Sequence, residues 1–236
     1  MSNRPLLPTV VVCAVCLIGL SSPADAASIR WNDIAGGPFD DASNWFPTAI
    51  PVAGDDVFFR LGSRVYTVEL RRVEASQSVR VGNRDRVTID LGSYKYTLTS
   101  GLNVIQNASL TLKNGTFNGG ISADLSGGSL TIDANRATFG GVVNVGNTGG
   151  ASLTVQNPGN LSGNALFVAT GSTAVASFDG AGSQGSMTRD IIVGGGARGT
   201  LNVSGGALVR ANDRVIIADG SGGLNSAASV KDAGST

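Results

Sequence analysis

Few side chains in this sequence of 236 residues could carry out chemistry, and histidine is absent altogether. Without histidine the chain lacks the usual general base of serine and cysteine hydrolases and the commonest zinc ligand. Both cysteines, Cys13 and Cys16, lie in an apolar run near the start, so disulfides and thiolate metal sites are excluded from the rest of the chain. Catalysis would fall to carboxylates, lysine, arginine and tyrosine, and we predict that the protein is not an enzyme.

The acidic pairs at 40–41 and 55–56 are the best candidates for a charged site. Neighbouring residues of a strand point to opposite faces, so Asp55 and Asp56 do not form a catalytic carboxylate pair by themselves. Because they follow Gly54 in a turn, their oxygens could instead hold Ca²⁺, a hard cation that prefers such ligands. The other interpretation is that they accept hydrogen bonds from backbone N–H groups of the turn. Calcium is the one metal hypothesis here, and we expect no other cofactor and no catalytic residue.

Aromatic residues gather towards the amino-terminal end, where Trp31 and Trp45 lie. If these tryptophans are exposed, their flat rings could stack on sugar rings and bind a carbohydrate. If they are buried, they supply the bulk that closes the end of a repeat array. Phenylalanine recurs about once per repeat further along, and this spacing predicts an internal aromatic ladder of Phe117, Phe139, Phe167 and Phe178.

The candidate side chains described above must be positioned by a short sequence phrase that repeats along the chain. The phrase Ser-Leu-Thr-Leu at 109–112 returns as Ser-Leu-Thr-Ile at 129–132 and as Ser-Leu-Thr-Val at 152–155. Its second position recurs every 20 to 27 residues, at 110, 130, 153, 176, 201 and 228. Alternating apolar and polar residues, separated by Gly, Asn and Ser, are typical of short strands joined by tight turns. The sequence therefore predicts an all-β fold, a parallel β-helix or solenoid of about 20–27-residue coils stabilised by stacking.

Residues 1–26 have the pattern of a signal peptide. Arg4 gives a positive start, an apolar run spans 10–20, and the small residues Ala24 and Ala26 mark a cleavage site. The apolar run is short for a membrane span, so we expect cleavage before Ala27 and no membrane span in the mature protein. This predicts an exported protein located in the periplasm, at the cell surface or outside the cell.

After residue 26 the sequence divides into two parts. Residues 27–76 contain both tryptophans but no copy of the repeated phrase, and we interpret them as an amino-terminal β cap with strands at 56–59 and 66–70. Such a cap would protect the open strand edges of the first coil. Residues 77–236 form the solenoid in this interpretation, and the last coil, which starts near 228, looks incomplete.

Charge is sparse and balanced, with 17 basic and 17 acidic residues. Proteins that bind nucleic acids usually carry a basic face, so we expect no nucleic-acid partner. The partners that suit an exported, neutral solenoid are extracellular polysaccharides and neighbouring surface proteins.

The chain resembles exported bacterial repeat proteins. The stretch 31–70 is similar to the amino-terminal region of large exported repeat proteins, and coils such as 192–206 look like autotransporter-type passenger repeats and the repeats of PEP-CTERM surface proteins. The resemblance implies a right-handed parallel β-helix displayed at, or released from, the cell surface. The membrane barrel and the short Pro-Glu-Pro anchor of those families are not found in this sequence.

The sequence leaves three hypotheses for function. The first is an exported structural or adhesion element without catalytic activity, whose regular outer face is the working surface. The second is a carbohydrate-binding or polysaccharide-active protein on the same scaffold, which would need Trp31, Trp45 and two carboxylates to converge on an open groove. The third is that the chain is the amino-terminal part of a larger autotransporter-like passenger.

Overall fold

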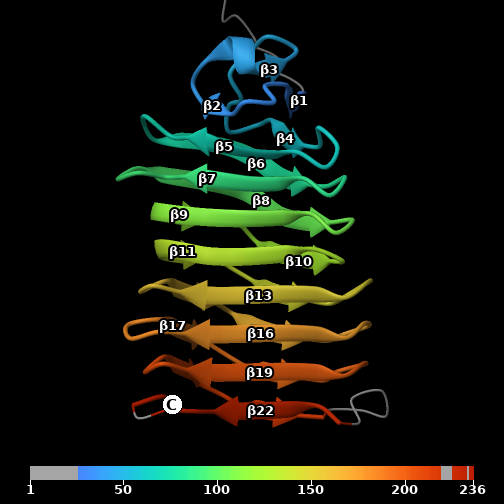
Figure 1. The fold of residues 1–236 in the computed structure, drawn as a ribbon, viewed down its shortest axis with the longest axis vertical. Coiled ribbons are helices and arrows are strands. Elements are labelled where there is room, and N and C mark those ends of the chain that lie inside the picture. Colours follow the sequence, from blue (N-terminus) through green and yellow to red (C-terminus); the bar gives the residue numbers. More distant parts are fainter. Residues whose placement is uncertain (1–25, 219–224, 233) are drawn as a thin grey trace, which may run out of the picture.

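The computed structural model describes residues 26–218, 225–232 and 234–236. Over these residues the chain is 56% strand and forms a parallel β-solenoid of about seven turns, with coils of about 23 residues (Figure 1). The all-β solenoid predicted from the repeated phrase is therefore confirmed. The described part contains one short 3₁₀ helix, η1 (Ala42–Asn44), and none of its helices is long and apolar enough to cross a membrane.

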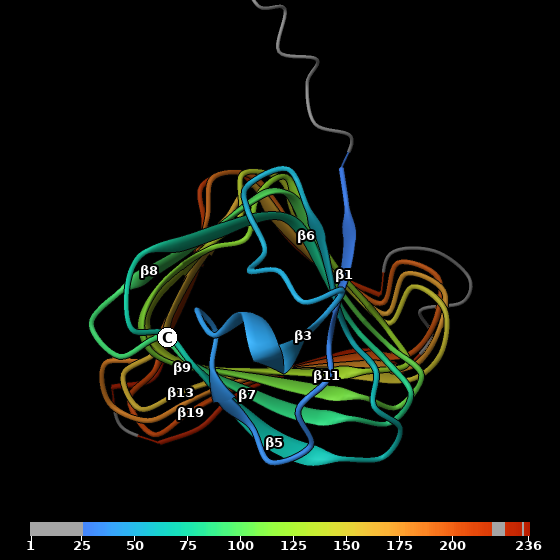
Figure 2. The same ribbon diagram turned by 90° about the horizontal axis from the view of Figure 1, so that it is seen from above.

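Each full coil contributes three strand segments, and the segments of successive coils stack into three faces around a common core (Figure 2). Face 1 consists of β1 (Ser28–Trp31), β4 (Asp56–Phe59), the second halves of β6 (Glu74–Val81) and β8 (Lys95–Ile105), β10 (Ser122–Ser126), β12 (Val142–Val145), β15 (Ala165–Val168), β18 (Ile191–Val193) and β21 (Val215–Ile217). Face 2 consists of β2 (Gly37–Pro38), β5 (Val65–Glu69), β7 (Arg86–Asp90), the first halves of β9 (Ser109–Asn118) and β11 (Ser129–Thr138), β13 (Ala151–Gln156), β16 (Ala174–Asp179), β19 (Gly199–Ser204) and β22 (Ala227–Val230). Face 3 consists of the first halves of β6 and β8, the second halves of β9 and β11, β14 (Asn160–Gly163), β17 (Gln184–Met187) and β20 (Leu208–Ala211).

The repeated phrase aligns in register along face 2. Leu110, Leu130 and Leu153 are direct neighbours in adjacent strands, and each is at most 1% exposed. Side chains alternate between the core and the solvent because strand residues point to opposite sides of a sheet. Neighbouring strands of a sheet lie about 4.8 Å apart, so each coil advances the solenoid by that distance. The phrase thus supplies one continuous inward ladder of aliphatic residues.

An aromatic cluster closes the amino-terminal end of the core. Trp31 and Trp45 meet edge to face with ring centroids 4.8 Å apart, across the antiparallel pair of β1 and β3 (Trp45–Phe46). The Trp45 ring also contacts Phe39 at 4.9 Å. Both indole N–H groups donate to backbone carbonyls, Trp31 to Asp33 at 2.6 Å and Trp45 to Phe39 at 2.7 Å. Bulk and satisfied polar atoms together let these rings cover the first coil.

The stacked coils begin earlier than residue 77. Strand β4 pairs in parallel with β6, and β5 pairs in parallel with β7, so the segment interpreted as cap already contributes strands to faces 1 and 2. The predicted strands at 56–59 and 66–70 do form, as β4 and β5. Strand β5 lies on face 2 but lacks the repeated phrase, because Tyr66 and Val68 fill the inward positions that align in register with Leu110 and Leu112.

The internal aromatic ladder is real but shorter than predicted. Phe117 lies between Tyr96 and Phe139, with ring centroids 5.8 and 6.0 Å away, and Phe178 is also fully buried. Phe167 does not belong to this ladder, because it occupies an outward position of β15 in face 1. The strand alternation, which the spacing of phenylalanines alone does not reveal, places it on the other side.

A buried carboxylate links the corners of two successive coils. Asp85 is fully buried between β6 and β7, and it accepts hydrogen bonds from the backbone N–H groups of Leu61 (2.5 Å) and Arg64 (3.0 Å) in the preceding corner. The hydroxyl of Tyr66 donates to the same carboxylate at 3.2 Å. Burial, and then the neighbouring negative charge, raise the pKa of Tyr66, so the phenol stays protonated and keeps donating.

Candidate functional site

The structure places both candidate sugar-stacking residues inside the molecule. Trp31 is 0% exposed and Trp45 is 1% exposed, so neither ring presents a face to the solvent. They lie in the aromatic cluster of the amino-terminal end and do not converge on an open groove with carboxylates. The sugar-stacking hypothesis for these two residues was wrong, because the solenoid end needs their bulk.

The acidic pairs make local hydrogen bonds. Asp55 is 7% exposed, and its two carboxylate oxygens accept from the backbone N–H groups of Ala27 (3.0 Å) and Val52 (2.9 Å). Asp56 instead accepts from the Ser78 hydroxyl at 2.5 Å. Since these oxygens already have backbone and hydroxyl partners, the turn-capping interpretation describes them better than the calcium hypothesis. Among the described residues no group of three or more Asp, Glu, Cys or His side chains is placed to hold a metal ion.

The other acidic pair contributes to η1. Asp41 precedes this helix, and its carboxylate accepts from both the backbone N–H and the hydroxyl of Ser43, at 2.9 and 2.6 Å. These hydrogen bonds lower the pKa of Asp41. The role is that of an N-cap and points to no ligand.

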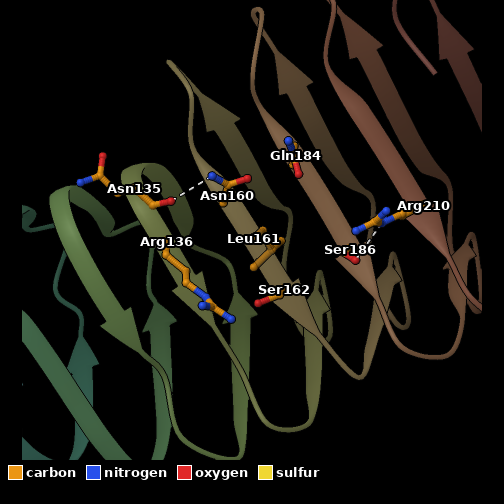
Figure 3. Close-up of a pocket in the computed structure, with 8 residues that line it drawn as sticks. All are labelled: Asn135, Arg136, Asn160, Leu161, Ser162, Gln184, Ser186 and Arg210. Carbon is orange, nitrogen blue, oxygen red and sulfur yellow. Dashed lines mark hydrogen bonds between the residues drawn. The ribbon is translucent and has the colours of Figure 1, made fainter.

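A polar groove lies instead on face 3, towards the carboxyl-terminal end of the solenoid (Figure 3). It has a volume of about 360 Å³ and runs across the second half of β11 and then β14, β17 and β20. We call it the face 3 groove. Its lining residues are Asn135, Arg136, Asn160, Leu161, Ser162, Gln184, Ser186 and Arg210.

Strand register arranges the polar side chains of the face 3 groove in two columns. Asn160 and Gln184 are direct neighbours in one column, and Ser162 and Ser186 are direct neighbours in the other. The first column continues back to Arg136, and the second continues on to Arg210. Alternation with inward residues makes all of them point outward. The result is a rigid array of amides and hydroxyls with one arginine at each end.

Both arginines lie across the sheet surface. The Nε of Arg136 donates to the Thr138 hydroxyl at 3.2 Å, and the Nε of Arg210 donates to the Ser186 hydroxyl at 3.1 Å. Neither guanidinium has a carboxylate partner within the described residues, whereas Arg72 and Arg214 pair with Glu74 and Asp190. The two arginines of the groove therefore keep donors for an external anion.

Charge is segregated between the faces. In face 3 the strand segments from β8 to β20 contain Lys95, Arg136 and Arg210 but no aspartate or glutamate. The outward column at the far edge of face 2 contains one lysine, Lys113, and four carboxylates: Glu69, Asp90, Asp133 and Asp179. Glycosidases of the common type use two carboxylates, and no carboxylate is among the residues that line the face 3 groove.

Face 2 carries a second ordered polar surface. The third residue of the repeated phrase points outward, and register lines up Thr67, Thr88, Thr111, Thr131 and Thr154 in one column. Beyond Thr154 the column continues with Ser177 and Asn202, where the face has a hollow of about 510 Å³. One carboxylate, Asp179, and one cation, Lys231, lie at its edge. This hollow is polar and mixed in charge.

Sequence reasoning missed the face 3 groove. A signal exists, because polar residues two apart flank a buried position at 160–162 and 184–186. Only strand register shows that these pairs stack into columns between two arginines.

No protein-family model matches the chain, and neither does any curated protein or any solved structure. Function must therefore be inferred from the fold and from the geometry of the face 3 groove.

Proposed function

We propose that the protein is an exported, non-catalytic β-solenoid of the bacterial surface or extracellular matrix, which acts as a structural or adhesion element. The observation that carries the proposal is the face 3 groove, an ordered polar surface on a rigid, stacked scaffold. The signal-peptide pattern that motivates export lies at residues 1–26, and residues 1–25 are outside the described residues. Stacked coils suit such a role because they repeat a similar strand geometry over a long surface.

Carbohydrate binding is the mode of adhesion that the groove favours. Sugar hydroxyl groups both donate and accept hydrogen bonds, and the side chains of Asn160, Gln184 and Ser162 can do the same. The groove is shallow and follows the strands' stacking direction, which suits an extended polymer. The polar lining and the direction of the groove support binding of a carbohydrate. The hypothesis of a polysaccharide-cleaving enzyme would need a pair of carboxylates in the groove, and no such pair supports it.

The proposal is tested by deleting the gene in cells that make the protein. We expect the deletion to reduce the amount of extracellular polysaccharide that washed cells retain and to weaken cell-to-cell adhesion. Complementation with the full chain should restore both properties. A chain that lacks residues 1–26 is the matched control, and it should not restore them, because it would stay inside the cell. Unchanged polysaccharide retention and adhesion in the deletion strain would contradict the proposal.

A further inference from the structure

We infer that face 3 binds a linear acidic polysaccharide, a polymer that contains uronic acids, laid along the solenoid axis across the face 3 groove. The inference rests on the proposed function and names its ligand class. Its anchors are the outward cations of face 3, Lys95, Arg136 and Arg210. Sulfated sugars would offer a similar anion, and the experiment separates them from uronates.

The cations are spaced along the axis. Lys95 pairs in register with Thr116, which pairs with Arg136, so these cations lie two coils apart. Three further coil steps separate Arg136 from Arg210. At about 4.8 Å per step, the separations are about 10 Å and about 14 Å. Lys95 and Arg136 share one column and Arg210 lies in the neighbouring column. Cations so widely spaced along the axis suit a polymer whose charges are spread along its length.

Carboxylate chemistry fits the two arginines. A guanidinium can bind a carboxylate through two parallel N–H donors, and this pairing is shorter and stronger than a neutral hydrogen bond. The Nε atoms of Arg136 and Arg210 already bond to face 3 hydroxyls, which fixes how each head group lies on the surface. The terminal amino groups are then held in place for an anion.

The surface between the two arginines suits uncharged parts of the same polymer. The intervening coils present Asn160 and Gln184 in one column and Ser162 and Ser186 in the other. These groups can exchange hydrogen bonds with ring hydroxyls without adding charge. Because each contact is exposed and weak, affinity would come from many contacts along one chain.

Nucleic acid fits this surface less well. A nucleic-acid strand carries one phosphate per 3.4 Å, a density that three cations spread over five coil steps do not match. Single strands also bind through stacking on aromatic rings, and none of the eight residues that line the groove is aromatic. The balanced total charge of the chain points the same way.

The inference is tested with the purified full chain and polygalacturonate, by affinity electrophoresis in gels that contain the polymer. The same polymer with its carboxyl groups methyl-esterified, a sulfated glycan, and single-stranded DNA are run in parallel. We expect retardation by polygalacturonate that weakens as salt is added and that disappears with the esterified polymer.

Variants of the groove locate the binding. Arg136→Gln and Arg210→Gln replace each guanidinium by an uncharged amide that can still donate hydrogen bonds. Each should weaken binding about fivefold, the scale of an exposed ion pair. The double variant should lose about 25-fold, since the two residues are too far apart to interact. Arg86→Gln, an exposed arginine of face 2, is the matched control and should bind like the wild type. Circular dichroism confirms that each variant is folded.

The inference is overturned if the esterified polymer binds as well as the acid, if the sulfated glycan or DNA binds more tightly than polygalacturonate, or if Arg136→Gln and Arg210→Gln bind like Arg86→Gln. These outcomes would leave the proposed surface role intact, because that role is tested separately by polysaccharide retention and adhesion in cells.

Discussion

Replacing Asp85 by alanine should destabilise the amino-terminal coils more than any surface change. The substitution removes the acceptor for the backbone N–H groups of Leu61 and Arg64, which are partly buried, and for the buried Tyr66 hydroxyl, and it does so at a carboxylate with no solvent exposure. A buried donor that loses its partner costs about 1–3 kcal/mol. Some of that cost is recovered if water enters the vacated space, so we expect a total loss of about 3–5 kcal/mol. Asp85→Asn keeps one acceptor oxygen and should lose less.

Urea unfolding followed with two probes measures this effect. Both tryptophans lie in the aromatic cluster above the first coil, so their fluorescence reports on the amino-terminal end, whereas far-ultraviolet circular dichroism reports on the whole solenoid. Repeat arrays can unfold in parts, because each coil contacts mainly its neighbours. With a denaturant slope of about 3 kcal/mol per molar urea, the fluorescence midpoint should fall by about 1–1.7 M. The circular dichroism midpoint should fall less.

The control is Asp133→Ala. This aspartate points outward from β11, and its carboxylate accepts no hydrogen bond from the described residues. Its loss should change stability by no more than about 0.5 kcal/mol, as is usual at the surface. If Asp85→Ala and Asp133→Ala shift the fluorescence midpoint equally, the account of Asp85 as the link between two corners is refuted.

Three further predictions test core packing, register and charge. A Cβ at Gly119 would lie 1.9 Å from the Phe139 ring. In urea unfolding, Gly119→Ala should therefore lower the free energy of unfolding by about 1–3 kcal/mol and Phe139→Ala by about 3–5 kcal/mol. The double variant should lose clearly less than the sum of the two, because removing the ring also removes the clash. Phe178→Ala, at an inward position, should likewise lower the free energy of unfolding by about 3–5 kcal/mol. Phe167→Ala, at an outward position, should lower it by less than about 1 kcal/mol. Equal losses for the two variants would contradict the strand register. The hydrogen bonds from Arg214 lower the pKa of Asp190, so this ion pair stabilises the fold above the ordinary carboxyl range and the stabilisation is lost as pH falls. The melting temperature of Asp190→Asn should therefore lie below that of the wild type at neutral pH, and the gap should narrow in acid; a gap independent of pH would argue against the pair.

The sequence was sufficient to predict the class of fold. The aliphatic positions Leu110, Leu130 and Leu153 recur with polar neighbours on each side, and only stacked strands bury every copy of such a phrase. The start of the coils was harder to place, because Tyr66 and Val68 fill the inward positions that align with Leu110 and Leu112, and these residues do not resemble the phrase. An inward position requires an apolar side chain of suitable volume and not one particular residue, so different residues can occupy it.

The candidate site could be predicted only in part. Composition correctly left Asp55 as a turn residue among the alternatives, but it could not say whether Trp31 and Trp45 faced the solvent, since a large aromatic residue suits either a core or a binding surface. The face 3 groove could not be predicted from the sequence, because Arg136 and Arg210 are 74 positions apart in it. They come to opposite ends of one groove only through coils of unequal length whose strands nevertheless stay in register.

The measurement that tests the central claim most directly is the amino-terminal sequence and cell fraction of the native product, detected with an antibody against the coils. An exported surface or matrix element should begin at or close to Ala27 and should be found in the envelope or the medium, where the antibody also labels intact cells. A product that still begins at Met1 and stays in the cytoplasm would contradict the account.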